Sequence, residues 1–498
     1  MTGARDRVLE EATASPTVSR AEFEARAPAL RVALLNAQFD LRASNESVVL
    51  LVAGDDRLGI AELVQLLHEW LDARHLDTCI FDEPTPEERE RPRYWRYWHA
   101  LPARGRMAVF VGAWPIDAVG ALVSGQLDDI GFEAALLEML EFERTLANEG
   151  TRIIKFWVHT PPAERARRLE QVRRDPRHDW RVEPSDWDLH EIHARAEPHV
   201  ERLLLQSSTP WAPWHVLDGR DDRTRDLALA EHLVADLGAA RAAPPAQSVP
   251  PLSPNPGRLP AVDLGRVLKS NDYERRLDDL HGQIAELSRR ARLAGQSTVL
   301  VFEGWDAAGK GGSIRRITQA LSVRDYRVMP VSAPDEAERA HHWLWRFWRA
   351  LPRAGTVLIL DRSWYGRVLV ERVEGYIDQP TWQRAYGEIR GFEAALIERG
   401  YVLLKFWLHI DPAEQFARFK ARENTPYKKY KIGAEDYRNR ARWDDYAVAA
   451  EEMFARTSTA SAPWHLVGMN DKRAGRIEII ETVCAALARR LDDVAPSA

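Results

Sequence analysis

The stretch Val299–Ile317, VLVFEGWDAAGKGGSIRRI, contains the most informative pattern in this chain. An apolar run ends in a glycine-rich turn, and a helical pattern follows. Gly304 and the pair Gly309-Lys310 have the spacing G-x-x-x-x-G-K of a phosphate-binding loop. Small residues let backbone N–H groups close around phosphate oxygens, while the helix N-terminus and Lys310 add positive charge. The residues expected to bind phosphate in this loop are Gly304, Ala308, Gly309, Lys310, Gly311, Gly312 and Ser313.

One position departs from the usual loop. Gly311 stands where such a loop normally carries the Ser or Thr that holds Mg²⁺. A metal bound here would need another ligand, and Asp306, inside the loop, is the nearest candidate.

A second motif is Thr356–Arg367, TVLILDRSWYGR, in which an apolar run ends at Asp361. A carboxylate at the end of a buried strand is costly unless it is paired or metal-bound. Beside a phosphate loop, Asp361 is expected to hold Mg²⁺, or Mn²⁺ in its place, together with Asp306. A simple turn residue is the alternative. Arg362 and Arg367 are expected to bind phosphate, and surface ion pairs are their alternative.

A third motif is the basic segment Arg418–Lys431, RFKARENTPYKKYK, which follows the helix after the fourth expected strand. Phosphotransferases often carry a mobile lid at this point. A positive lid would gather a polyanion and neutralise charge on a transferred phosphoryl group. A solvated charged face is the alternative. The lid residues expected to contact phosphate are Arg418, Arg422, Lys428, Lys429 and Lys431.

Bulk composition narrows the classes of protein. The 498 residues carry a formal net charge of −6, so no global basic field would attract nucleic acid. The two cysteines, Cys79 and Cys484, indicate neither a disulfide framework nor a metal site. The first residues contain no apolar signal-peptide core, and no run is long enough to cross a bilayer. We therefore expect a cytoplasmic protein.

The chain reads as a tandem duplication. YWRYWHALP at 94–102 matches LWRFWRALP at 344–352, and KFWVH at 155–159 matches KFWLH at 405–409. Trp114 and Trp364 fall in the same register, 250 residues apart. So many matches at one offset are not a coincidence of tryptophans.

Each half alternates apolar runs with longer amphipathic segments. This pattern predicts an α/β fold in which two tandem P-loop-kinase-like domains each contain a parallel sheet flanked by helices. The strands expected in the second half are 298–303, 326–331, 356–361, 401–408 and 464–467. The helices expected there are 310–321, 336–350, 380–399, 410–422, 440–457 and 471–491. The expected domains are 1–238, a Pro/Ala-rich linker at 239–262, and 263–498.

The first half lacks the residues that matter for chemistry. Gly54, Asp56 and Gly59 keep the loop spacing, but Ile60 replaces Lys310. Val111, Gly112 and Asp117 replace Asp361, Arg362 and Arg367, respectively. Because phosphoryl transfer depends on such cations and metal ligands, we predict that the first domain is catalytically inactive.

At GWDAAGKGG, DRSWYGR and the basic segment, the sequence resembles the polyphosphate kinase 2 family. The resemblance covers about 265–495 strongly and about 17–238 in degenerate form. The fused arrangement is similar to class II members, which transfer a phosphoryl group from inorganic polyphosphate to AMP and form ADP. By this resemblance the catalytic residues are Asp306, Lys310, Asp361 and Arg362, with Arg367 and the lid bases on the phosphates.

The resemblance implies inorganic polyphosphate, AMP and ADP as partners and no nucleic acid or membrane, with homo-oligomer formation left open. One alternative is a polyphosphate-dependent kinase of nucleoside diphosphates, and another is an ATP-dependent nucleotide kinase. A non-catalytic polyphosphate or nucleotide sensor is a third, and Lys310 and Asp361 argue against it.

Overall fold

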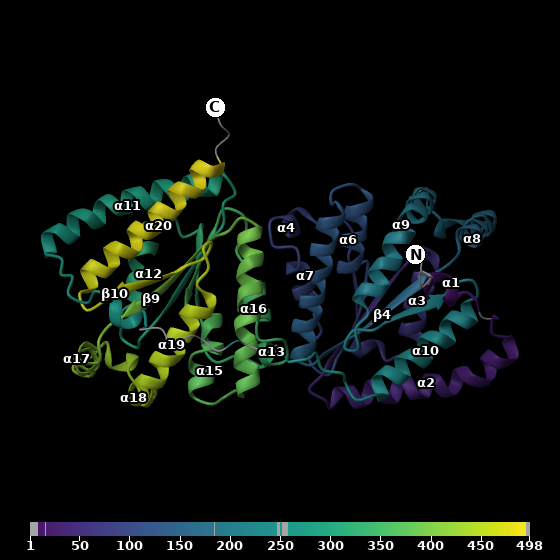
Figure 1. The fold of residues 1–498 in the computed structure, drawn as a ribbon, viewed down its shortest axis with the longest axis horizontal. Coiled ribbons are helices and arrows are strands. Elements are labelled where there is room, and N and C mark those ends of the chain that lie inside the picture. The colour runs from purple at the N-terminus through teal and green to yellow at the C-terminus, as the bar shows by residue number, and fades with distance from the viewer. Residues whose placement is uncertain (1–7, 15, 184, 247–249, 251–256, 495–498) are drawn as a thin grey trace. The chain divides into compact units, whose positions relative to one another are not determined.

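The computed structural model of the chain describes residues 8–14, 16–183, 185–246, 250 and 257–494 (Figure 1). The linker expected at 239–262 lies partly outside these residues. The chain forms two compact units, each with contributions from both halves of the sequence. Unit 1 consists of Met1–Pro84, Arg96–Pro245 and Asp335–Trp345. Unit 2 consists of Thr85–Trp95, Ala246–Pro334 and Arg346–Ala498.

Each unit contains a parallel five-stranded sheet. In unit 1 the order is β2-β3-β1-β4-β5, and in unit 2 it is β7-β8-β6-β9-β10. The two sheets therefore have the same topology. The strands of unit 1 are β1 (Ser47–Gly54), β2 (Leu76–Ile80), β3 (Met107–Val111), β4 (Thr151–His159) and β5 (Trp214–Asp218). Those of unit 2 are β6 (Thr298–Gly304), β7 (Tyr326–Pro330), β8 (Val357–Asp361), β9 (Val402–His409) and β10 (Trp464–Gly468).

The five strands predicted for the second half are confirmed. Both central strands, β1 and β6, are buried along nearly their whole length, as expected for strands covered on both faces. The carboxyl ends of parallel strands meet at one edge of the sheet, so the phosphate loop after β6 and Asp361 at the end of β8 come together there.

Helices cover both faces of each sheet. In unit 1, α2, α3 and α10 lie on one face and α6, α7 and α9 on the other (Figure 1). The helices of the first sequence half are α1 (Val8–Ala12), α2 (Arg20–Arg42), α3 (Arg57–Trp70), α4 (Pro86–Arg89), α5 (Trp95–Ala100), α6 (Trp114–Val123), α7 (Asp129–Asn148), α8 (Pro162–Arg174), α9 (Ser185–Ser207) and α10 (Asp222–Gly238).

In unit 2, α11, α12 and α20 cover one face, and α16 and α19 cover the other (Figure 1). The helices of the second sequence half are α11 (Ser270–Leu293), α12 (Lys310–Thr318), α13 (Glu336–Arg339), α14 (Trp345–Ala350), α15 (Val370–Val373), α16 (Gln379–Glu398), α17 (Pro412–Glu423), α18 (Ala434–Ala441), α19 (Trp443–Thr457) and α20 (Lys472–Val494). Among the described residues, no helix is both long and apolar enough to cross a membrane.

One predicted helix is wrong. The segment expected as a single helix over 336–350 forms two short helices, α13 and α14. A capping box at Asp335 and Glu338 starts α13, and the chain then turns at His342, whose ring nitrogen accepts a hydrogen bond from the N–H of Leu344 (3.1 Å). Phe347 and Trp348 of this segment are buried in the core.

The motifs repeated in both halves build the same buried cluster. In unit 2 the Lys405 ammonium donates to Glu393 (2.7 Å) and to the carbonyl of Thr457, while the Trp364 indole N–H donates to Glu393 (3.0 Å). In unit 1 Lys155, Glu143 and Trp114 repeat this arrangement (2.7 and 3.0 Å). A buried charge needs a partner and hydrogen bonds, and here each has both. The lysines of the KFW motifs, the tryptophans Trp114 and Trp364, and their partners Glu143 and Glu393 are therefore structural.

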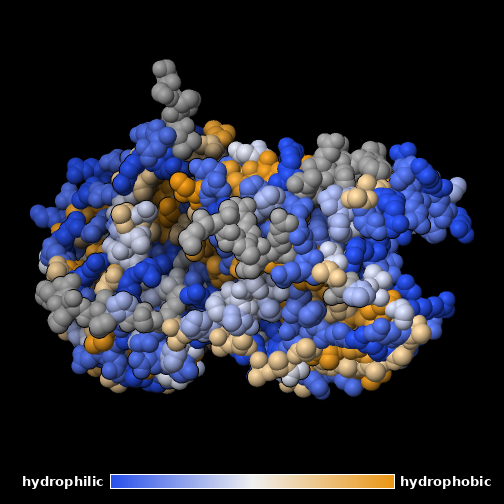
Figure 2. Space-filling view, turned by 45° about the vertical axis from the view of Figure 1, so that its right-hand side comes forward, coloured by the Kyte–Doolittle hydropathy of each residue, from blue (hydrophilic) through white to orange (hydrophobic). Residues whose placement is uncertain are grey.

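The outer helices of the two copies differ in character. Apolar side chains gather along the lower edge of the face drawn in Figure 2, where α2 runs in Figure 1, and Val32 and Phe39 of α2 are 58% and 51% exposed. At the matching positions α11 carries Gly282 and Arg289. The duplicated domains have thus diverged on their surface as well as at the edge of the sheet.

Candidate active site

The chain reverses direction sharply after β6, in a turn that depends on glycine. At Gly304, where φ is 136°, an added Cβ would lie 2.3 Å from the carbonyl oxygen of Leu408 on the neighbouring strand. Gly309 (φ 119°) precedes the first residue of α12, Lys310, and Ala307 also has a positive φ of 64°. Left-handed backbone of this kind is common at functional loops. The turn thereby directs the N-terminus of α12 toward the edge of the sheet, as an anion site requires.

Lys310 folds back over the loop. Its ammonium donates to the carbonyl oxygens of Gly304 (2.7 Å) and Trp305 (3.3 Å). Burial lowers the pKa of Lys310, which the nearby carboxylates of Asp306 and Asp361 oppose. In this conformation the ammonium lies beside the loop. The G-x-x-x-x-G-K spacing predicted this position for Lys310.

Asp306 connects three elements of the site. Its carboxylate accepts from the Arg362 guanidinium (3.0 Å) and from the Asn439 side-chain amide (2.9 Å), and its carbonyl oxygen accepts from Gln415 (3.1 Å). Burial opposes ionisation of Asp306, but Lys310 and Arg362 outweigh this, so its pKa lies below its ordinary value. Asp306 is therefore an anion in the described conformation.

Asp361 and Arg362 occupy the turn after β8. Arg362 has a φ of 64°, a conformation that a non-glycine residue adopts at a cost of about 1–3 kcal/mol. A Cβ built on Gly311 would lie 3.7 Å from the Asp361 carboxylate oxygen, so the start of α12 and this carboxylate are neighbours. The position that usually carries a metal-binding hydroxyl thus lies directly beside Asp361.

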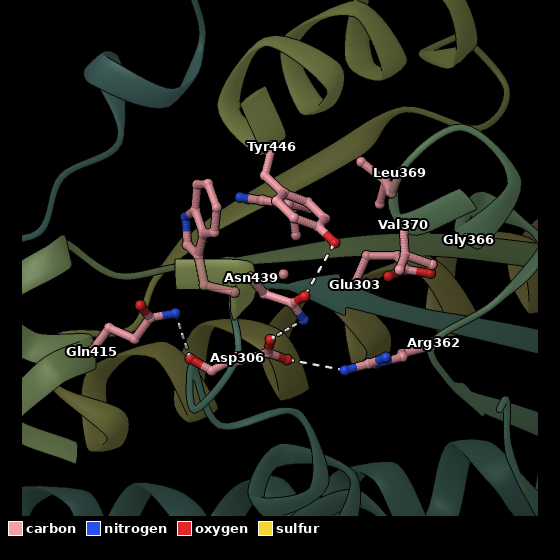
Figure 3. Close-up of a pocket in the computed structure, with 12 residues that line it drawn as sticks. Glu303, Asp306, Arg362, Gly366, Leu369, Val370, Gln415, Asn439 and Tyr446 are labelled. Carbon is pink, nitrogen blue, oxygen red and sulfur yellow. Dashed lines mark hydrogen bonds and ion pairs between the residues drawn. The ribbon is translucent and has the colours of Figure 1, made fainter. Parts of the chain in front are cut away.

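Asp306 and Arg362 border a cavity of about 70 Å³ (Figure 3). Glu303, Asp306 and Arg362 form its polar floor, and Tyr446 approaches from helix α19. The cavity is lined by Glu303, Gly304, Trp305, Asp306, Arg362, Gly366, Leu369, Val370, Trp407, Gln415, Asn439 and Tyr446. Charged groups on one side and aromatic or aliphatic walls on the other suit a phosphorylated organic ligand.

Helix α19 packs against the loop through an aromatic pair. Trp443, at the start of α19, stacks on Trp305 of the loop with ring centroids 3.6 Å apart and an angle of 11° between the planes. The Asn439–Asp306 hydrogen bond adds a polar contact beside it. Sequence reasoning did not single out Glu303, Gln415, Asn439, Trp443 or Tyr446. A position-by-position comparison of the two halves could have found them, since Ala53, Arg165, Leu189, His193 and Ala196 stand at their positions in the first half.

The predicted phosphate-binding bases of the lid have different surroundings. The Arg418 guanidinium donates to the backbone carbonyls of Ala307 and Ala308 in the loop and to those of Met469 and Asn470 after β10. Arg418 thus holds the loop in place in this conformation. Lys428 and Lys429 are exposed. Arg422 lies at the end of α17, and the side chain of Lys431 lies outside the described part of the structure.

Arg367 lies on the turn after β8 and pairs with Glu371 (2.9 Å). A further group of cations was not predicted. Lys472 and Arg476, at the start of α20, lie near Arg418, and a Cβ on Gly312 would be 2.8 Å from the Arg476 guanidinium. Burial and these neighbouring cations lower the pKa of Lys472 to about 8.

The matching edge of unit 1 has no phosphate-loop turn. Helix α3 begins at Arg57, whereas α12 begins at Lys310, three positions later in the common register. The Asp56 carboxylate caps α3 by accepting from the N–H of Gly59 (3.1 Å). A side-chain carboxylate therefore occupies the helix N-terminus where an anionic ligand would bind.

Arg168 of α8 covers this capped end. It pairs with Asp56 (3.0 Å), Asp222 (3.2 Å) and Glu62. Glu62 and Asp222 stand at the positions of Gly312 and Lys472, so acids have replaced a loop glycine and a site cation. Glu62 and Arg168 also border a cavity of about 460 Å³, whose lining contains five Asp or Glu side chains and four arginines. The interpretation of Gly54 and Gly59 as a surviving loop needs correction: Gly59 is helical, and Gly54 is required by its 2.3 Å approach to Val158.

The parallel sheet and its glycine-rich turn define a protein of the P-loop-kinase-like class. The sequence matches the polyphosphate kinase 2 family twice, over residues 17–244 and 267–494, and the chain belongs to this family. It is 42% identical to the polyphosphate:AMP phosphotransferase of Pseudomonas aeruginosa over 488 residues, 96% of this chain and 98% of that protein.

Two further relatives show how the likeness is distributed. ADP-polyphosphate phosphotransferase 3 of Rhizobium meliloti is 38% identical over 227 residues, which is 46% of this chain and 80% of that protein. A crystal structure from P. aeruginosa assigned to polyphosphate kinase 2 superposes with a TM-score of 0.88 at 41% identity, covering 97% of this chain and 99% of the other. The two P. aeruginosa matches therefore share the two-domain arrangement with this chain along nearly their whole length.

Proposed function

We propose that this chain is a polyphosphate:AMP phosphotransferase, which moves the terminal phosphoryl group of inorganic polyphosphate to AMP and forms ADP. The observation that carries this proposal is the match over nearly the whole length of both proteins to a two-domain phosphotransferase of that name. The loop with Lys310, the neighbouring Asp361 and the Asp306–Arg362 pair support it in unit 2.

We assign the chemistry to the second domain, 263–498. Lys310, Arg362 and Arg367 would neutralise the charge spread over the transferred group, and lid bases would hold the donor chain. The AMP phosphate is already an anion, so it needs no strong general base. Catalysis then depends mainly on positioning and electrostatics.

A divalent cation, Mg²⁺ or alternatively Mn²⁺, fits the donor set of this site. Within the described residues, no group of three His, Cys, Asp or Glu side chains could hold a metal alone. Asp306 and Asp361 offer two carboxylates, and Mg²⁺ is commonly held by one or two carboxylates together with waters and substrate phosphates. When bound, the metal would draw charge from the phosphoryl oxygens. Asp306 must then exchange its contacts with Arg362 or Asn439.

The first domain, 1–238, is proposed to be inactive. Its helix N-terminus is capped by Asp56, its loop turn is helical, and Arg168 pairs with three acids beside it. A supporting role in folding or assembly fits these contacts. The cytoplasmic location expected from the sequence stays a prediction.

One assay tests the donor and the acceptor together. The protein is incubated with Mg²⁺, AMP and either long-chain polyphosphate or ATP, and ADP is followed. We expect ADP with polyphosphate. Formation with ATP alone would replace this proposal by an ATP-dependent nucleotide kinase.

The single-domain likeness to an ADP-polyphosphate phosphotransferase favours a second candidate, a polyphosphate-dependent kinase of nucleoside diphosphates. Replacing AMP by ADP or GDP, with polyphosphate as donor and ATP or GTP as the product that is followed, decides between them. Faster phosphorylation of the diphosphate would favour this second candidate.

A further inference from the structure

Glu303 is a buried acid at the centre of the site to which the proposed chemistry gives no task. It is the last but one residue of β6, only 5% exposed, and it lines the cavity (Figure 3). The Ser363 hydroxyl donates to its carboxyl oxygen at 2.7 Å. Burial raises the pKa of Glu303, although Ser363, Lys310 and Arg362 oppose this. A group that is costly to bury calls for an explanation.

The Glu303–Ser363 hydrogen bond ties the turn after β8 to the strand that carries the phosphate loop. Within this turn, Ser363 caps the short helix Trp364–Arg367. Its oxygen also accepts from the N–H of Tyr365 (3.2 Å). On the same strand, the carbonyl of Phe302 accepts from the N–H of Arg362 (3.0 Å). Arg362, held between these contacts, then reaches Asp306 (3.0 Å).

Unit 1 shows what this turn does without the pair. Ala53 and Ala113 replace Glu303 and Ser363, and both alanines are buried. The turn nevertheless keeps its shape, because Gly112 has a φ of 65° where Arg362 has 64°. Both partners are thus absent from the copy that lacks Lys310 and Arg362, so this fold does not require the pair.

We propose that Glu303 and Ser363 form a positioning pair for phosphoryl transfer, which fixes Arg362 and its turn relative to the loop that carries Asp306 and Lys310. This inference rests on the proposed phosphotransferase function. In this proposal Glu303 acts through its hydrogen bond to Ser363 and through the turn that Ser363 belongs to. Because a displacement of about 1 Å at a reacting centre can cost about 10²-fold in rate, a hydrogen bond at this junction is enough to matter.

The test is a double-mutant cycle in the full chain with E303A, S363A and E303A/S363A, and with E303Q beside it. ADP formation from AMP and polyphosphate is measured as kcat and KM. We expect each alanine variant to lower kcat by about 10–100-fold with KM for AMP changed less than about threefold. The double variant should be no slower than the slower single one, because both changes remove one interaction.

E303Q keeps an oxygen that accepts from Ser363, so we expect kcat within about fivefold of the wild-type value. As a control in unit 1, A113S should leave kcat unchanged. The thermal unfolding midpoint of E303A/S363A should stay near that of the wild type, since the same alanine pair is native in unit 1.

Three results would overturn the proposed positioning role of Glu303 and Ser363. These are a double variant whose loss is the product of the single losses, alanine variants with unchanged kcat, and E303Q as slow as E303A. The same kinetics can be run with whichever donor the wild-type protein uses, polyphosphate or ATP. A failure of the proposed donor is therefore distinguishable from a failure of the pair.

Discussion

The two sheet edges of this protein share one topology but differ in the turn that follows the central strand and in the charged groups around it. In unit 2 the turn after β6 contains three residues with positive φ, and the cations Lys310, Arg362, Lys472 and Arg476 lie around it. In unit 1 the same stretch is helical, and Asp56 caps it. The buried Lys–Glu–Trp clusters remain the same in both.

The difference separates residues that serve the fold from residues that serve the site. What both units retain, such as the Lys405 and Lys155 clusters and the glycines against β9 and β4, satisfies buried charge or avoids a steric clash. Lys310, Arg362 and the Glu303–Ser363 pair occur only in unit 2, where they lie at the edge of the sheet. The duplication thus provides an internal control, because a residue of one unit can be changed beside its counterpart in the other.

The largest effect is expected from K310A. Removing the loop cation should lower kcat by on the order of 10³-fold, because preorganised charge at the transferred group is lost. The measurement is ADP formation from AMP and polyphosphate. The matched change I60K in unit 1 should create no activity when K310A is also present, since the N–H groups there already face Asp56. Activity of the I60K/K310A protein would show that unit 1 retains a competent loop.

The next effect contrasts two matched arginines. R418A removes the donor to four backbone carbonyls around the loop, and we expect kcat to fall by about 10²-fold through lost loop geometry. R168A should leave kcat within about twofold. It should instead destabilise unit 1 by on the order of 2 kcal/mol, because Asp56 and its neighbours lose a partner.

Measuring kcat and the thermal unfolding midpoint of R418A and of R168A tests this contrast. R418K serves as the conservative control, since its single ammonium cannot reach four carbonyls and should recover only part of the loss. Equal kinetic losses in R418A and R168A would contradict the division of labour between the units.

A third prediction concerns pH and Lys472. Its pKa of about 8, lowered by burial and by Arg418, means that this charge is present at pH 7 and largely lost at pH 9. If Lys472 helps to hold the donor chain, KM for polyphosphate should rise about three- to tenfold between these pH values. K472R should remove most of this rise, because arginine stays charged. The measurement is KM for polyphosphate at pH 7, 8 and 9 at one ionic strength, since salt screens such contacts.

The contribution of Lys472 to folding stability changes in the opposite direction: stability rises with pH, whereas polyphosphate binding weakens. Between about pH 8 and pH 10.5, the ordinary pKa of lysine, the unfolded chain binds more protons at Lys472 than the folded chain does, so this group makes folding more favourable as pH rises. A parallel fall in polyphosphate binding and in stability would therefore point to another group.

Sequence patterns predicted much of this molecule because they report on backbone and burial. Apolar runs between amphipathic segments gave the strands of unit 2, and the spacing around Lys310 gave the loop. They did not distinguish a phosphate loop from its remnant. Gly54, Asp56 and Gly59 keep the spacing, yet Asp56 caps a helix that begins where the loop would turn. Which of two turns a glycine-poor segment adopts depends on tertiary partners such as Arg168.

Contacts between segments that are distant along the chain also could not be predicted from the sequence. Arg418 was expected on phosphate because it lies in a basic run, but its neighbours in space are carbonyls of the loop and of residues after β10. Glu303 was hidden in an apolar strand, and only its distance to Ser363, 60 positions later in the chain, gives it a role. Side-chain partners at such separations are fixed by packing.

The smallest effect is expected from D56N, beside the large effect of the matched D306N. Asparagine is as good a helix cap as aspartate, so α3 should keep its N-terminal hydrogen bond, and Arg168 keeps Glu62 and Asp222 as partners. We expect D56N to lower the stability of unit 1 by less than about 1 kcal/mol and to leave kcat unchanged. D306N removes a charge that holds Arg362 and is proposed to bind metal, so its kcat should fall by at least about 10²-fold. Thermal unfolding and ADP formation on both variants, over a range of Mg²⁺ concentrations, measure the contrast. A comparable kinetic loss in D56N would mean that the carboxylate of unit 1 still takes part in the reaction and that the two edges have diverged less than their contacts indicate.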